Sequence, residues 1–137
     1  MTAERRPWRS PGHRGVVDPV TMERLAERML AADSEGIREL LRPDAVVIVD
    51  SGGIVDAMRR PVEGDCDAAT VLAEVASAEA TSGESAARTA SINGAPGFVL
   101  SRGGVVFAAV TAETRGARLA RVWVVCNPDK LRHWNRG

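Results

Sequence analysis

The stretch that decides the fold is Ala117–Trp134, which reads ARLARVWVVCNPDKLRHW. Its first part, Ala117–Cys126, predicts a strand, because β-branched and aromatic residues occur along an alternating pattern. Apolar residues fall on both faces, which is typical of a central strand that is covered on one side and lines an interior on the other. Asn127-Pro128-Asp129 ends this strand, since proline has no N–H to donate and asparagine favours turns. The chain is therefore expected to finish in sheet, followed by a basic tail.

Length and charge favour one globular domain with basic ends. The 137 residues are enough for one substantial core. The formal net charge is zero, so bulk charge predicts neither nucleic-acid nor membrane binding. Residues 1–16 carry four arginines against one glutamate, and residues 127–137 carry three basic residues against one aspartate, which leaves the body between them at net −5. We predict a flexible basic arm over residues 1–17 and a single domain over 18–137. The basic ends are either solvated tails or a docking surface for an acidic partner.

The two cysteines do not predict a metal site. Cys66 and Cys126 have no CxxC spacing and no neighbouring histidines, so both are expected to be reduced, buried thiols. No phosphate-binding loop pattern is present, and no cofactor is predicted. Arg5-Arg6 is not followed by an apolar run, and no window is long and apolar enough to span a membrane. A cytoplasmic location is the expectation.

The order of the predicted elements is helices first and sheet last. Asp18-Pro19 is a helix start, an N-cap acid followed by proline, and a shorter second helix follows Asp33 or Ser34. A third helix begins near Asp65 or Asp67. The predicted strands, separated by glycine-containing turns and by the third helix, cover Ala45–Val49, Arg88–Ile92, Gly97–Leu100, Val105–Thr114 and Ala117–Cys126.

This order places the chain in the α+β class. A strongly curved antiparallel sheet over the N-terminal helices makes a cone with one open end. Such a cone is expected to hold a small-molecule pocket.

Four short motifs carry a resemblance to a known group of domains. The order resembles the nuclear-transport-factor-2-like fold, also called SnoaL-like after a polyketide cyclase. The motifs are similar to those of the SnoaL-like C-terminal domain of certain extracytoplasmic-function sigma factors of actinobacteria, over about residues 18–134. They are Asp50-Ser51-Gly52-Gly53, Arg60-Pro61-Val62-Glu63-Gly64, Asn93-Gly94-Ala95-Pro96-Gly97 and Asn127-Pro128-Asp129-Lys130-Leu131.

The sequence also departs from that group. Ser51 replaces a glycine of the Asp-Gly-Gly-Gly-Lys motif, and Ile54 stands where its lysine would be. No helical sigma regions precede the domain in this sequence, so direct promoter binding is not expected. In the sigma factors the domain is thought to regulate activity through contacts with the sigma core, and the resemblance implies a remnant of that role here.

Ten residues are candidates for a functional site. Asp50 is the candidate base, since burial raises a carboxyl pKa toward neutrality. Asn93 is a candidate oxyanion donor and Arg121 a group that orients the substrate. A turn-capping role for Asp50 and a turn role for Asn93 are the simpler alternatives. Predicted ligand-binding residues are Val47, Phe98, Phe107 and Trp123, although Trp123 is only a packing residue if its face is turned to solvent. Predicted interaction-surface residues are Asn127, Asp129 and Lys130.

Two functions from different classes follow. The first is a small-molecule enzyme, a cyclase, isomerase or epoxide-opening enzyme of secondary metabolism that acts by acid/base chemistry. The second is a non-catalytic module that binds a hydrophobic ligand or docks on a transcription protein. The expected partners are a small hydrophobic molecule, a second copy of the chain in a homodimer, and a sigma factor or polymerase. A dimer would use the outer face of the last two strands.

Overall fold

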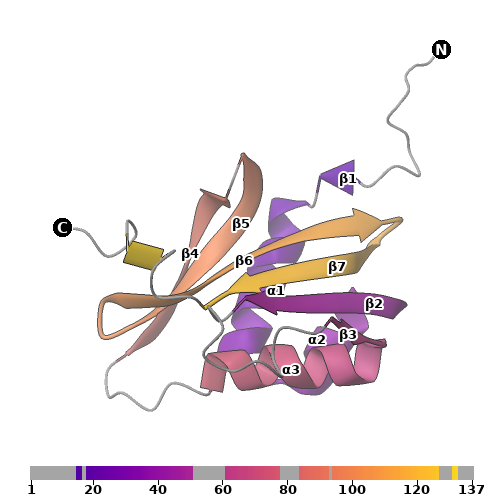
Figure 1. Ribbon diagram of the computed structural model, residues 1–137, viewed down its shortest axis with the longest axis horizontal. Coiled ribbons are helices and arrows are strands. Elements are labelled where there is room, and N and C mark those ends of the chain that lie inside the picture. The colour runs from indigo at the N-terminus through magenta and orange to yellow at the C-terminus, as the bar shows by residue number, and fades with distance from the viewer. Residues whose placement is uncertain are drawn as a thin grey trace.

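The computed structural model describes residues 15–16, 18–50, 61–77, 84–92, 94–126 and 131–132. Within these ranges the chain forms three helices and seven strands. The helices are α1 (Pro19–Leu30), α2 (Ser34–Leu40) and α3 (Asp65–Ser77). The strands are β1 (Gly15–Val16), β2 (Leu41–Asp50), β3 (Val62–Glu63), β4 (Ser85–Ile92), β5 (Ala95–Arg102), β6 (Val105–Arg115) and β7 (Arg118–Val125). Figure 1 shows the helices on one side of one twisted sheet. The predicted α+β class, with a curved sheet over the helices, is confirmed.

The helices begin where their capping residues predict. The Asp18 side chain accepts a hydrogen bond from the Val20 N–H at 3.3 Å, and Pro19 opens α1. Asp33 caps α2 in the same way by accepting from the Gly36 N–H at 3.0 Å. Because both caps satisfy N–H groups that a helix leaves unpaired, they fix the two helix starts.

The sheet order differs in one respect from the expected antiparallel arrangement. Its strands run in the order β3-β2-β7-β6-β5-β4, with β1 paired to β6. Strands β2 and β7 are parallel, with Val47 opposite Val122 and Val49 opposite Val124. The other strand pairs are antiparallel. The parallel pair arises because the chain leaves β2, passes through β3, α3 and the strands β4, β5 and β6, and inserts β7 between β2 and β6.

The core lies between the helices and the sheet face turned toward them, which we call the inner face. Val47 and Val49 of β2 and Val122 and Val124 of β7 are buried on this face. They pack in one cluster with apolar residues of all three helices, including Leu25, Met29, Ile37 and Leu72. Among the described residues no polar or charged residue is buried. The described residues that bound the inner space are therefore apolar.

The opposite, outer face carries a smaller apolar cluster. Val99, Val106 and Ala109 lie there and pack with Leu131, which follows the last strand. Leu131 is only 3% exposed, so its side chain covers part of the outer face. The remainder of that face carries the half-buried or exposed alternate residues of β2 and β7.

Arg102 connects β5 to two other elements. Its Nε donates to the Ser85 hydroxyl of β4 at 2.8 Å, and its Nη2 donates to the Ala76 carbonyl of α3 at 2.8 Å. Ala76 lies in the last turn of α3, where a helix leaves carbonyl groups unpaired. The guanidinium also lies 5.3 Å from the centre of the Phe107 ring.

We expect Arg102→Lys to lower the free energy of unfolding by about 1–2 kcal/mol, because one ammonium group cannot donate to both partners in the guanidinium geometry. Urea unfolding followed by circular dichroism measures this loss. Arg88→Lys is the matched control, since Arg88 is an exposed arginine of the neighbouring strand. Equal stability of the two variants would contradict the bridging role.

Candidate functional site

A groove between α1 and the β4–β5 hairpin is the best candidate for a ligand site. Its volume is about 470 Å³, within the range of about 300–1,000 Å³ typical of small-molecule sites. One side comes from α1 and the other from β4 and Phe98 of β5. The lining residues are Glu23, Ala26, Glu27, Leu30, Ala87, Arg88, Thr89 and Phe98. We call this feature the α1–β4 groove.

Helical and strand periodicity explain which side chains face the groove. Glu23, Ala26, Glu27 and Leu30 recur at intervals of three and four residues and so share one side of α1. On β4, Ala87 and Thr89 lie opposite Leu100 and Phe98, both buried residues of the core cluster. Their side chains therefore belong to the inner face, and Arg88 between them lies on the outer face.

The groove has an apolar floor and a polar rim. Phe98 is 1% exposed and Ala26 is 5% exposed, so they close the floor, and Leu30 is half-buried. Glu23 and Glu27 are exposed on the helix side, and Thr89 is exposed on the strand side. The rim thus offers two carboxylates and one hydroxyl above an apolar base.

Comparison with solved structures identifies the fold. The extracytoplasmic-function sigma factor SigJ of Mycobacterium tuberculosis is similar at 21% identity, with a TM-score of 0.57, over 82% of this chain and 43% of that chain. An NTF-2-like protein of unknown function from Burkholderia xenovorans is similar at 10% identity, with a TM-score of 0.53, over 86% of this chain and 92% of that one. The chain has a SnoaL-like, nuclear-transport-factor-2-like fold.

A third similar structure is a putative ketosteroid isomerase from Kribbella flavida, at 12% identity and a TM-score of 0.52, over 78% of this chain and 75% of that chain. No protein-family model and no curated protein matches the sequence. At these identities the likeness establishes the fold of the SnoaL-like domain, and its function has to be argued from its own residues.

Of the three candidate catalytic residues, the two that the structure describes, Asp50 and Arg121, do not line the groove. Asp50 is the last residue of β2 and follows Val46 and Ile48 on the outer face. Its backbone carbonyl accepts a hydrogen bond from the Cys126 N–H at 2.7 Å. Arg121 of β7 is exposed, also on the outer face. Asn93 lies outside the described residues.

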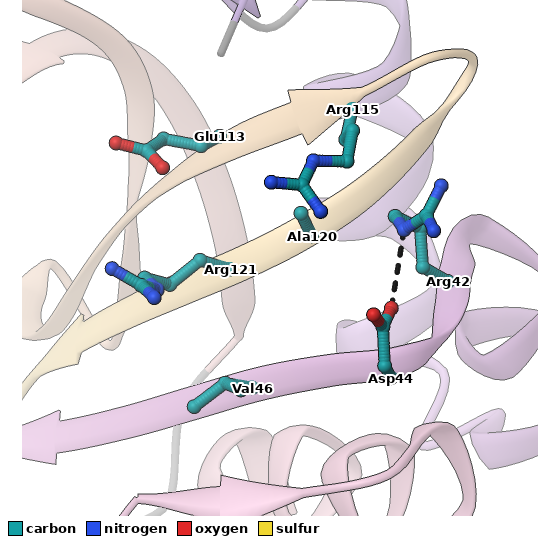
Figure 2. Close-up of a pocket in the computed structure, with 7 residues that line it drawn as sticks. All are labelled: Arg42, Asp44, Val46, Glu113, Arg115, Ala120 and Arg121. Atoms are coloured by element: carbon teal, nitrogen blue, oxygen red, sulfur yellow. Dashed lines mark hydrogen bonds and ion pairs between the residues drawn. The ribbon is translucent and has the colours of Figure 1, made fainter. Parts of the chain in front are cut away.

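Arg121 lines a separate, polar depression of about 150 Å³ on the outer face. Figure 2 shows its seven lining residues, with side chains from β2, β6 and β7. The Arg121 guanidinium lies 5.9 Å from the centre of the Trp123 ring, so these two residues share the outer face as the alternation predicts. Trp123 is half-buried there and lies opposite Ile48 of β2.

The predicted ligand-binding residues are divided between the two faces of the sheet. Phe98 is on the inner side and closes the groove floor. Val47 is fully buried in the inner core, and Phe107 packs against the same core while half-buried. Trp123 is on the outer face, so the four do not line one pocket.

The remaining sequence expectations have mixed outcomes. The predicted interaction residues Asn127, Asp129 and Lys130 lie outside the described residues, as do Ser51–Arg60. Cys66 is exposed on α3, so the expectation that both thiols are buried is wrong for it, and Cys126 is half-buried. Cys66 lies near the start of α3, away from the apolar side that faces the core, and this position explains its exposure.

Among the described residues, no group of three or more His, Cys, Asp or Glu side chains has an arrangement suited to a metal ion. No described helix is long and apolar enough to cross a membrane.

A third hollow, of about 370 Å³, contains an ion pair that ties α2 to α3. Arg38 Nε donates to Asp65 Oδ2 at 3.2 Å. The hydrogen bond to Asp65, helped by the nearby negative charge, raises the pKa of Arg38 above its ordinary value. Arg38 therefore stays charged, and a structural role accounts for this pair.

Proposed function

We propose that this SnoaL-like domain binds a small, largely apolar molecule in the α1–β4 groove without carrying out chemistry on it. The observation that supports this most directly is the groove itself, a hollow of about 470 Å³ above Ala26, Leu30 and Phe98. Apolar floors with a few polar rim groups are the usual composition of small-molecule sites.

The rim specifies the polar part of the ligand. Glu23 and Glu27 lie one turn apart on the exposed edge of α1, and the Thr89 side chain lies on the strand that forms the other wall. Carboxylates accept hydrogen bonds and attract positive charge. The best ligand is therefore an apolar ring or chain that carries a hydroxyl or amine donor.

Neither carboxylate of the groove is buried in apolar surroundings, and this favours binding over catalysis. Acid/base catalysis near neutrality depends on a carboxyl group set in apolar surroundings. Both groove carboxylates are exposed, and the described residues include no buried polar or charged group. Asp50, the base expected for an enzyme, does not line the groove. We therefore prefer the non-catalytic alternative to the cyclase or isomerase.

The experiment fills the groove with one side chain and leaves the rest of the domain unchanged. Ala87→Trp is expected to weaken binding of Nile red, a neutral apolar dye, by at least about tenfold, a loss of about 1.4 kcal/mol. Ala87 is exposed and belongs to the inner side of β4, so an indole at this position occupies the hollow. Fluorescence titration of the dye measures the affinity.

Ala86→Trp is the matched control. Ala86 is the exposed neighbour on the same strand, opposite Ser101, so its side chain is on the other side of β4. This variant is expected to bind Nile red as the parent does, and thermal unfolding verifies that both variants are folded. Equal affinity in the two variants, or no saturable binding by the parent, contradicts the proposal.

A further inference from the structure

The polar depression on the outer face gathers arginines from three adjacent strands. Arg42 comes from β2, Arg115 from the end of β6 and Arg121 from β7. Figure 2 shows Ala120 and Val46 between these residues, with the Arg42 and Arg115 guanidinium groups on one side and the Arg121 guanidinium directed away from them. The hollow is about 150 Å³ and lies on the side of the sheet away from the core. We call it the arginine depression.

Two of the three arginines are held by neighbours that leave donors available. Arg42 Nε donates to Asp44 Oδ1 at 3.1 Å, and the dashed line in Figure 2 marks this contact. A guanidinium has five N–H donors, so the terminal nitrogens of Arg42 retain donors beyond this bond. The Arg121 guanidinium lies 5.9 Å from the centre of the Trp123 ring, which orients a cation without using its N–H groups.

Arg115 and Arg121 form no ion pair with any residue in the described ranges. Glu113 lies directly opposite Arg121 in the β6–β7 ladder, yet the guanidinium is placed over Trp123 and not against this carboxylate. Three arginines thus line one hollow with two carboxylates, Asp44 and Glu113. The local charge is +1.

This local charge is opposite to that of the surrounding body, which is net −5 between residues 17 and 126. Like charges gathered in one hollow repel one another, and a bound anion relieves that repulsion. Planar guanidinium forks match the paired oxygens of phosphate and carboxylate groups, and such charge-assisted hydrogen bonds are the stronger kind.

We propose that the arginine depression binds a single oxyanion group, a phosphate, sulfate or carboxylate, carried by a small ligand. A hollow of about 150 Å³ holds one such group, since a liquid water occupies about 30 Å³. The donors are the terminal nitrogens of Arg42 and Arg115, and Arg121 adds positive charge at the edge of the hollow. This site is on the opposite side of the sheet from the α1–β4 groove and does not depend on the function proposed for that groove.

The test is a titration of the parent chain with inorganic phosphate, followed by ¹⁵N NMR of the arginine Nε–H groups and the β6–β7 amides. Ionic strength is held constant with sodium chloride, because general screening would otherwise mimic binding. We expect saturable shifts confined to the arginine depression. Sulfate and acetate titrations in parallel show whether a tetrahedral or a planar oxyanion binds better.

Three substitutions are expected to change the phosphate affinity in three different ways. Arg115→Gln is expected to weaken phosphate binding by about tenfold, because it removes a charge and its fork. Glu113→Gln is expected to strengthen binding by about two- to fivefold, because it removes a like charge from the rim. Arg24→Gln changes an exposed arginine of α1, outside both the depression and the groove, and is expected to leave the affinity unchanged.

The order of the phosphate affinities of the parent and the three variants decides the test. The site is supported if Glu113→Gln binds phosphate more tightly than the parent and Arg24→Gln, and Arg115→Gln binds it more weakly than both. The absence of a saturable shift with all three anions overturns the proposal. Equal weakening by Arg115→Gln and Arg24→Gln also overturns it, because it indicates general charge attraction. The Nile red measurements on the groove are independent, so the two proposals fail separately.

Discussion

Phe98→Ala is expected to lower the free energy of unfolding by about 3–5 kcal/mol, the range for removing a buried aromatic ring. Phe98 is 1% exposed on β5 and belongs to the cluster that joins the helices to the inner face. Removal of the ring leaves a cavity beneath the α1–β4 groove, which neighbouring side chains can fill only in part. Urea unfolding followed by circular dichroism gives the loss directly.

Phe107→Ala is the matched control, since Phe98 and Phe107 are the two phenylalanines of the chain. Phe107 is half-buried under the Arg102 guanidinium. We expect it to cost less than half as much, because part of its ring is already in water. Comparable losses in the two variants would show that Phe98 is not the better packed of the two rings.

Gly97→Ala is expected to destabilise the domain by about 2–3 kcal/mol, as overpacking of a filled site does. A Cβ at this position would meet the Val110 carbonyl oxygen of the adjacent strand and approach Ile92 Cγ1 to 2.7 Å. The oxygen is backbone and cannot move without breaking the β5–β6 ladder. Thermal or urea unfolding measures the change.

Whether Gly97→Ala lowers or raises the free energy of unfolding tests the close approach of β5 and β6. At a strand position with free space, glycine to alanine stabilises by about 0.4–1 kcal/mol, because the unfolded chain loses freedom. A gain in stability for Gly97→Ala would therefore contradict the close approach of β5 and β6. Gly116→Ala is the control for a different mechanism: its site is open, but its φ of +69° costs about 1–2 kcal/mol for a residue with a side chain.

Much of the fold was predictable because its signals are local. Asp18-Pro19 marked the start of α1, and the apolar pattern around Trp123 marked the last strand. Each signal depends on residues within a turn or two of one another. The parallel pairing of β2 with β7 was not predicted, because it joins segments about 75 residues apart and leaves no local trace in the sequence.

The site was less predictable for a specific physical reason. A strand with apolar residues on both faces does not reveal which face is turned to the helices. In β7 the helices cover Val122 and Val124, which leaves Arg121 and Trp123 outside. The groove residues Glu23 and Glu27 resemble the solvated side of an amphipathic helix, and only the position of β4 across from them creates a hollow. The one signal available was their spacing on the same side of α1 as Ala26 and Leu30.

The insertion of β7 between β2 and β6 has a consequence for synthesis of the protein. When β2 leaves the ribosome, its neighbour on one side is the last strand of the sheet, which has not yet been translated. One hydrogen-bonding edge of β2 is then unpaired for most of elongation. The nascent chain is thus most prone to aggregate before β7 emerges, and it is in this interval that a holdase chaperone would have its binding target.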